Sequence, residues 1–114
     1  MESKLKIRIA YGSNTVIGPG KAQLLEAIKK LGSISKAANS MEMSYRRAWE
    51  LVNVMNQSFK KPIVITMHGG SHGGGAQISE LGELLLQSYR TMETKMTKAA
   101  DRELSLIYSK LAEN

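Results

Sequence analysis

The chain has 114 residues, 42% of them hydrophobic, so it is long enough for one compact domain and short for two. Sixteen Lys and Arg against ten Asp and Glu give a formal net charge of +6, which favours a polyanionic partner such as nucleic acid or an acidic membrane surface. The absence of cysteine excludes a disulfide framework, and no segment approaches the roughly 20 apolar residues that span a bilayer, so we expect a soluble cytoplasmic protein.

The first third of the chain predicts a β-hairpin followed by a helix. Apolar and basic residues alternate from Lys4 to Ile9, and a turn at Gly12–Asn14 leads into the β-branched segment Thr15–Ile17. The segment Gly18–Gly20 then breaks the chain. Leucine and isoleucine recur at helical spacing from there to Gly32, a residue type that ends helices.

Two further helices follow, joined by a tight turn. Ser33 or Ser35 is positioned to cap a short helix, and Ser44 is positioned to cap a third helix over about residues 44–59. At about 100° per residue, the third helix has an apolar side and a polar side. The apolar side carries Ala48, Leu51, Val52, Met55 and Phe59, and the polar side carries Arg46, Glu50 and Asn53.

The region over about residues 63–78 predicts a second hairpin with a glycine-rich tip. Ile63–Met67 is short and β-branched, and the sequence HGGSHGGGA follows. The loop lacks the Gly-Lys-Ser/Thr ending of a phosphate-binding P-loop, so we interpret it as a wing that approaches DNA closely. His68 and His72 are the only histidines and lack a nearby carboxylate, so no metal site or other cofactor is expected.

The last predicted helix runs over about residues 79–112, beginning at Ser79. Its apolar residues recur every three or four positions, and such a stripe on a small domain usually finds a partner helix. We therefore expect a homodimer. The residues predicted to contribute to dimerisation are Leu85, Tyr89, Met92, Met96, Leu104, Ile107 and Leu111.

Three helices followed by a β-hairpin is the element order of a winged helix-turn-helix, so the fold class expected is α+β, mainly α, over residues 1–114. An arginine guanidinium on the third helix matches guanine O6 and N7 in the major groove of double-stranded DNA. We expect contacts with phosphate or bases from a set of polar and aromatic residues, although Trp49 is also well placed for packing. The set is Ser35, Lys36, Ser44, Tyr45, Arg46, Arg47, Trp49, His68 and His72.

Other function classes fit the pattern less well. There are no paired carboxylates on the predicted groove face and no cysteine nucleophile, so an enzyme is not expected. A winged-helix module that binds a protein partner, and a non-specific DNA-binding protein, remain as alternatives. A membrane-surface helix is disfavoured because Glu93, Asp101 and Glu103 interrupt the polar side of the last helix.

The segment GKAQLLEAIKKLGSISKAANSMEMSYRRAWELVNVMNQSFKKPIV, from Gly20 to Val64, resembles the N-terminal DNA-binding domain of the ModE-type molybdate-responsive regulators, relatives of the LysR-type domain. SYRRAW is its most specific part, and GGSHGGGAQISELGELLLQSYR extends the resemblance through the wing into the last helix. The resemblance implies a dimeric regulator whose third helix enters the major groove and whose last helix contributes to the dimer. Family members carry a C-terminal oxyanion-sensing module that is not expected in this chain, so molybdate binding is not expected either.

Overall fold

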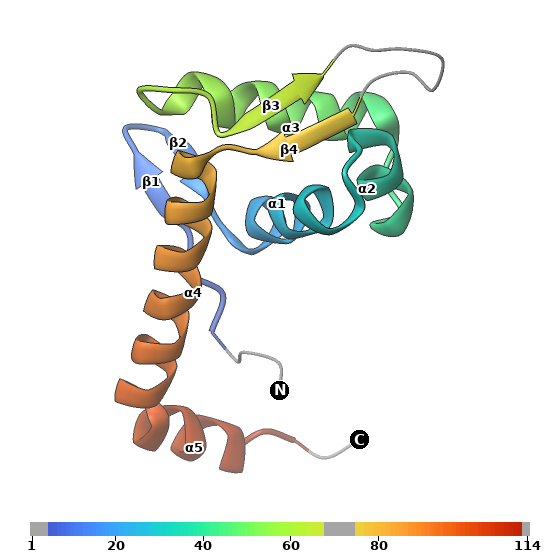
Figure 1. Cartoon of the computed structure of the whole chain (residues 1–114). Coiled ribbons are helices and arrows are strands. Elements are labelled where there is room, and N and C mark those ends of the chain that lie inside the picture. The colour runs from blue at the N-terminus through green and yellow to red at the C-terminus, as the bar shows by residue number, and fades with distance from the viewer. Residues whose placement is uncertain (1–4, 68–74, 113–114) are drawn as a thin grey trace.

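The computed structural model describes residues 5–67 and 75–112, which form five helices and two antiparallel hairpins (Figure 1). The first hairpin is β1 (Ile9–Tyr11) with β2 (Asn14–Ile17), turning at Gly12, whose φ of 63° is the left-handed conformation that glycine adopts without strain. It is followed by the three helices α1 (Pro19–Leu31), α2 (Ile34–Ser40) and α3 (Tyr45–Ser58). The wing strands are β3 (Val64–Met67) and β4 (Gly75–Ile78), and the chain continues into α4 (Glu80–Ala99) and α5 (Asp101–Ser109). The predicted mainly α winged helix-turn-helix is confirmed.

The core lies where α1, α2 and α3 meet the wing strands. Small residues stand at the crossing of α2 and α3, where Ala37 and Ala48 are fully buried and let the two helices approach closely. Burying a large aliphatic side chain contributes roughly 1.5–3 kcal/mol, so a single layer of such residues holds this small unit together. The largest fully buried side chains around the crossing are Leu24, Leu25, Ile28, Val52, Met55 and Ile63.

Three serines fix the starts of helices. The Ser33 hydroxyl accepts from the Lys36 N–H (3.2 Å), and the Ser44 hydroxyl accepts from the Arg47 N–H (3.0 Å), so each supplies a partner that the first turn of a helix lacks. Ser33, rather than Ser35, is therefore the cap of α2. The Ser79 hydroxyl accepts from the Gly82 N–H (3.1 Å) and donates to the Pro62 carbonyl (2.8 Å), which anchors α4 to the chain entering the wing.

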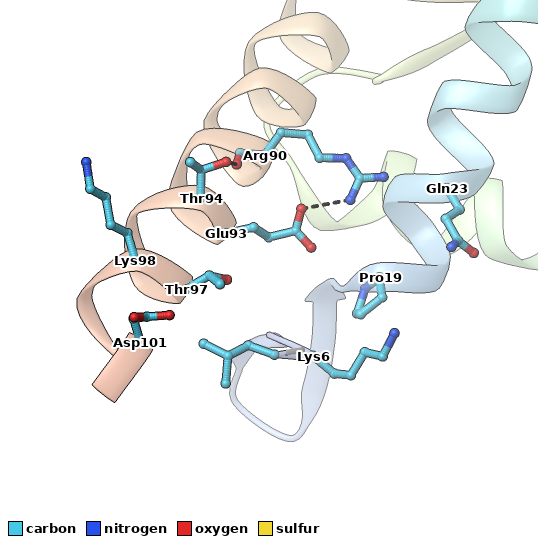
Figure 2. Close-up of a pocket in the computed structure, with 10 residues that line it drawn as sticks. Lys6, Pro19, Gln23, Arg90, Glu93, Thr94, Thr97, Lys98 and Asp101 are labelled. Atoms are coloured by element: carbon cyan, nitrogen blue, oxygen red, sulfur yellow. Dashed lines mark hydrogen bonds and ion pairs between the residues drawn. The ribbon is translucent and has the colours of Figure 1, made fainter. Parts of the chain in front are cut away.

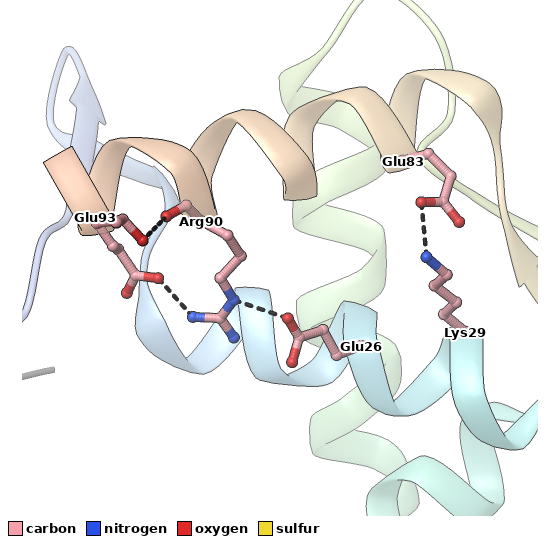
Figure 3. Close-up of polar contacts among 6 residues, drawn as sticks. Glu26, Lys29, Glu83, Arg90 and Glu93 are labelled. Atoms are coloured by element: carbon pink, nitrogen blue, oxygen red, sulfur yellow. Dashed lines mark hydrogen bonds and ion pairs between the residues drawn. The ribbon is translucent and has the colours of Figure 1, made fainter. Parts of the chain in front are cut away.

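The first half of α4 and Met92 just after it pack on the body of the domain. Leu86 and Tyr89 are buried there, and the Tyr89 hydroxyl donates to the Ile7 carbonyl. Two ion pairs join this half of α4 to α1, Lys29 with Glu83 (3.0 Å) and Arg90 with Glu26 (2.8 Å), as Figure 3 shows. These contacts fix the direction in which α4 leaves the domain.

The C-terminal part of α4 projects away from α1, α2 and α3 (Figure 1). An open cavity of about 670 Å³ separates this part of α4 from the N-terminal segment and the start of α1, with Lys6 and Pro19 on one side and Thr97 and Asp101 on the other (Figure 2). The projecting half of α4 therefore has little support from its own domain. Within residues 5–67 and 75–112, no helix combines the length and apolarity that crossing a membrane requires.

The expected single helix over residues 79–112 is divided in two at Ala100, and α5 turns away from the axis of α4 (Figure 1). The Ala100 N–H still bonds the Met96 carbonyl (2.9 Å), and the next regular bond joins the Leu104 N–H to the Ala100 carbonyl (2.9 Å). Asp101 and Glu103 lie in the first turn of α5, where the helix dipole favours negative charge. The apolar residues continue at helical spacing through Ala100, so the sequence pattern did not indicate that a new helix begins there.

Candidate nucleic-acid interface

The outer side of α3 presents a set of polar and aromatic side chains that we call the reading face: Tyr45, Arg46, Arg47, Glu50 and Asn53. The side chains of the two arginines are 91% and 60% exposed. The opposite side of the helix is fixed in the core, with Ala48, Val52 and Met55 fully buried. The predicted division of α3 is thus confirmed, and a rigid element holds the arginines outward.

The beginning of α2 lies beside the reading face. A hollow of about 230 Å³ is lined by Ser35 from α2, Tyr45 and Trp49 from α3, and Thr66 from the wing. These three elements therefore meet around one concave surface. Lys36 is exposed in the first turn of α2, next to Ser35.

Trp49 lies at the inner edge of this hollow. Its side chain is half-buried and packs against the core, and its ring meets the Tyr45 ring edge to face, with centroids 6.1 Å apart. Edge-to-face pairs of this kind stabilise the position of both rings. Trp49 thus has a packing role, which was expected from the sequence as the alternative to DNA contact. Its ring also supports the outward position of Tyr45.

The base of the wing is tied to the helix-turn-helix by backbone and side-chain bonds. The Ala76 N–H donates to the Gly32 carbonyl at the turn between α1 and α2 (2.9 Å). Asn56 of α3 accepts from the N–H groups of Ile63 and Val64 (2.8 and 3.0 Å). The wing strands are therefore held in a fixed position relative to α3. His68 and His72, predicted to contact DNA from the wing tip, lie outside the described residues.

The charged side chains on and near α3 interact with one another. Glu50 accepts ion pairs from Arg46 (3.5 Å) and from Arg47 (3.7 Å) on the same helix. Burial lowers the pKa of the Lys21 ammonium below its usual range, and the nearby Arg47 cation lowers it further. Glu50 had been placed on the polar side of the helix from its spacing, but its pairing with both arginines requires side-chain rotamers that spacing alone does not specify.

The predicted dimerisation residues fall into three groups. Met96, Ile107 and Leu111 are 43–59% exposed, and these are large apolar side chains without cover on the projecting part of the chain. Leu85, Met92 and Leu104 are half-buried. Tyr89 is 2% exposed and belongs to the core of the domain, so it is removed from the predicted interface. Tyr89 was included because it follows Leu85 at helical spacing. That spacing carries no information about the N-terminal segment, which contacts Tyr89 in the fold.

The described residues hold no cluster of three or more His, Cys, Asp or Glu side chains with the arrangement of a metal site. The surface around α3 carries the Glu50 carboxylate together with guanidinium, hydroxyl and amide groups, which are hydrogen-bond donors. Such donor groups donate hydrogen bonds to phosphate oxygens and to the acceptor atoms of base edges.

No protein-family model matches the chain. It is 36% identical over 88 residues to the molybdenum transport protein ModE of Azotobacter vinelandii, an alignment covering 77% of this chain and 33% of that protein. It is 37% identical over 83 residues to the molybdenum-pterin-binding protein MopA of Rhodobacter capsulatus, covering 73% and 31%. It is 32% identical over 101 residues to the DNA-binding transcriptional dual regulator ModE of Escherichia coli K12, covering 89% and 38%.

The chain thus spans about a third of the length of these curated relatives, and the shared part is their N-terminal portion. The alignments cover most of the present chain, at an identity that chance does not produce over such a length. The chain therefore belongs with the ModE-type proteins, as a homologue of their N-terminal portion.

Proposed function

We propose that this protein is a sequence-specific transcription regulator that binds double-stranded DNA as a homodimer. The observation that carries the proposal is the reading face, where Arg46 and Arg47 project from a helix whose other side is locked in the core. The relatives include proteins named as transcriptional regulators, one of them described as DNA-binding. In this proposal α3 enters the major groove and reads bases through the first turn of the helix.

The phosphate backbone is assigned to the neighbouring elements. Ser35 and Lys36 lie exposed at the start of α2, beside the hollow that the helix-turn-helix shares with the wing. A lysine there neutralises a phosphate and releases a counterion, which gives affinity without sequence preference. The wing strands lie on the far side of the hollow, with Thr66 and Ala76 lining it, and we assign the wing to the phosphate backbone or the minor groove.

The homodimer is assigned to the projecting part of the chain. Met96, Ile107 and Leu111 expose large apolar side chains on α4, on α5 and just beyond α5. Apolar surface of this kind is covered in stable proteins, most simply by the same surface of a second copy. Two reading faces related by a two-fold axis then address half-sites about 34 Å apart, or a multiple of that distance.

The decisive experiment is selection of binding sites from a random pool of duplex DNA at about 0.15 M salt. We expect an enriched motif with two similar half-sites. Arg46→Ala should then weaken binding to the selected site by about 1–3 kcal/mol and relax the preference at one base pair of each half-site. The full binding profile on single-base variants of the site measures both effects.

Two outcomes would redirect the proposal. An equal loss on all sequences upon Arg46→Ala would remove this residue from base recognition and leave it as a phosphate contact. Failure to enrich any motif would favour a non-specific DNA-binding protein if duplex still binds, and a protein-interaction module if it does not.

A further inference from the structure

Glu50 occupies an unexpected place for an acidic residue, because it lies on the reading face one turn after the two arginines. Its carboxylate divides between them: Oε1 lies 3.5 Å from Arg46 Nε, and Oε2 lies 3.7 Å from Arg47 Nη1. The side chain is 53% exposed, so the carboxylate is accessible to any ligand that binds the reading face. One carboxylate thus lies within ion-pair distance of both guanidinium groups of the predicted reader.

These ion pairs are not needed for folding. Exposed pairs within one helix contribute well under 1 kcal/mol, because solvent screens them and ordering long side chains opposes them. The helix is already fixed by its Ser44 cap and its buried side. A carboxylate on this surface also repels DNA phosphates, so it lowers the affinity for DNA in general. Because Glu50 adds little stability and lowers the affinity for DNA in general, we look for its role in discrimination between DNA sequences.

The chemistry of base edges provides one. A carboxylate accepts hydrogen bonds and donates none, so in the major groove it matches the N4 amino group of cytosine, whereas a phosphate offers it nothing. On non-matching DNA, each arginine must leave Glu50 to reach phosphate, and the carboxylate then stands against negative charge unpaired. On matching DNA, the guanidinium groups bind guanine while Glu50 accepts from cytosine.

We propose that Glu50 is a specificity-determining residue that orients Arg46 and Arg47 toward base edges, accepts from a cytosine amino group and penalises DNA that lacks the matching base. The inference rests on the proposed function and deepens it. In this inference the Glu50 carboxylate attracts the matching base through a hydrogen bond and repels non-matching DNA through its charge. Binding surfaces commonly discriminate between partners by combining attraction and repulsion in this way.

The test compares the wild-type chain with Glu50→Gln on the selected site and on a scrambled duplex of equal length, over a series of salt concentrations. Glu50→Gln keeps the size of the side chain and removes its charge. We expect tighter binding to the scrambled duplex, a steeper salt dependence, and a fall of about tenfold in the ratio of specific to non-specific affinity. Preference for cytosine should relax at one position of the half-site.

Glu80→Gln is the matched control, since it makes the same change in net charge at an exposed position in the first turn of α4. It should leave the affinity ratio and the base preference unchanged. An affinity ratio unaltered by Glu50→Gln, or lowered equally by Glu80→Gln, overturns the assignment. If the wild type itself shows no preference for any sequence, the proposed function has failed, and that result is separate from a failure of the role of Glu50.

Discussion

Gly82 shows at the residue scale why a good helix former is excluded from the first turn of α4. A Cβ atom at this position would lie 2.4 Å from the Ile63 carbonyl oxygen and 3.2 Å from the Ile78 Cβ. That carbonyl accepts from the Ser79 N–H (3.0 Å), and the Ile63 N–H is held by Asn56 (2.8 Å), so the backbone has little freedom to move aside. The close approach of α4 to the start of the wing depends on the missing side chain.

We therefore predict that Gly82→Ala destabilises the fold by about 1–3 kcal/mol, in spite of a helix propensity that favours alanine by about 1 kcal/mol. Gly20→Ala is the matched control, because it lies in the first turn of α1 with no atom within 4 Å of an added Cβ. That change should stabilise the protein by up to about 1 kcal/mol. Urea unfolding midpoints measure both, and shifts of the same sign would contradict the packing described here.

Lys36 carries a second prediction at this scale, concerning DNA rather than stability. It is exposed at the start of α2, and its backbone N–H, not its ammonium group, serves the Ser33 cap. Lys36→Ala should weaken binding to all sequences and reduce the slope of log affinity against log salt by about 1. Lys95→Ala, on the projecting half of α4, should leave the slope unchanged. An unaltered slope in the Lys36 variant would remove this residue from the phosphate contacts.

At the scale of elements, Asn56 joins the recognition helix to the wing. Its Oδ1 accepts from the backbone of Ile63 and Val64, and its Nδ2 donates to the Val64 carbonyl (3.1 Å). Both partners are buried, so the loss of this side chain leaves backbone groups without water or another partner. This amide side chain therefore positions the wing together with the backbone hydrogen bond from Ala76 to Gly32.

Asn56→Ala should accordingly destabilise the protein by roughly 2–4 kcal/mol, since each buried group left unsatisfied costs roughly 1–3 kcal/mol. Asn53→Ala, one turn earlier on the exposed side of α3, should change the free energy of unfolding by less than about 0.5 kcal/mol. Denaturant titration of the two variants distinguishes a structural tether from an ordinary polar position. Equal stability of both variants would show that the wing is held by other contacts.

Local sequence signals predicted most of the elements, because each was marked by its own residues. Ser44 and Ser79 marked helix starts, Gly32 marked a helix end, and the glycine-rich run marked the hairpin. Features that depend on segments distant in sequence could not be obtained in this way. The Tyr89 hydroxyl donates to a carbonyl 82 positions earlier. The role of Asn56 depends on the path of the irregular segment between Ser58 and Ile63, which no local signal specified. The break at Ala100 carried no glycine or proline.

At the scale of the whole molecule, the shape itself indicates an uncovered surface. The radius of gyration is 16.5 Å and the extents are 56 × 34 × 24 Å, whereas a compact chain of about 100 residues has a radius of gyration near 13 Å. The excess length comes from the projecting half of α4 and from α5 (Figure 1). An isolated helix of this length is marginal in water, so its apolar side needs a partner.

The proposed dimer follows from this shape and is tested at Met96, which is 43% exposed on the projecting half of α4. Met96→Glu places a charge in the apolar seam, the exposed apolar surface of Met96, Ile107 and Leu111. Burying an unpaired charge is far more costly than leaving it in water, so the variant should be a monomer by sedimentation equilibrium. Thr94→Glu introduces the same charge on the side of α4 that lines the cavity toward α1, and it should remain dimeric. The Met96 variant should also bind a single half-site like the wild type but lose the gain in affinity that two linked half-sites confer. A dimer that survives Met96→Glu would exclude this seam as the interface, and it would place the two-fold axis on a surface of the domain other than its projecting helices.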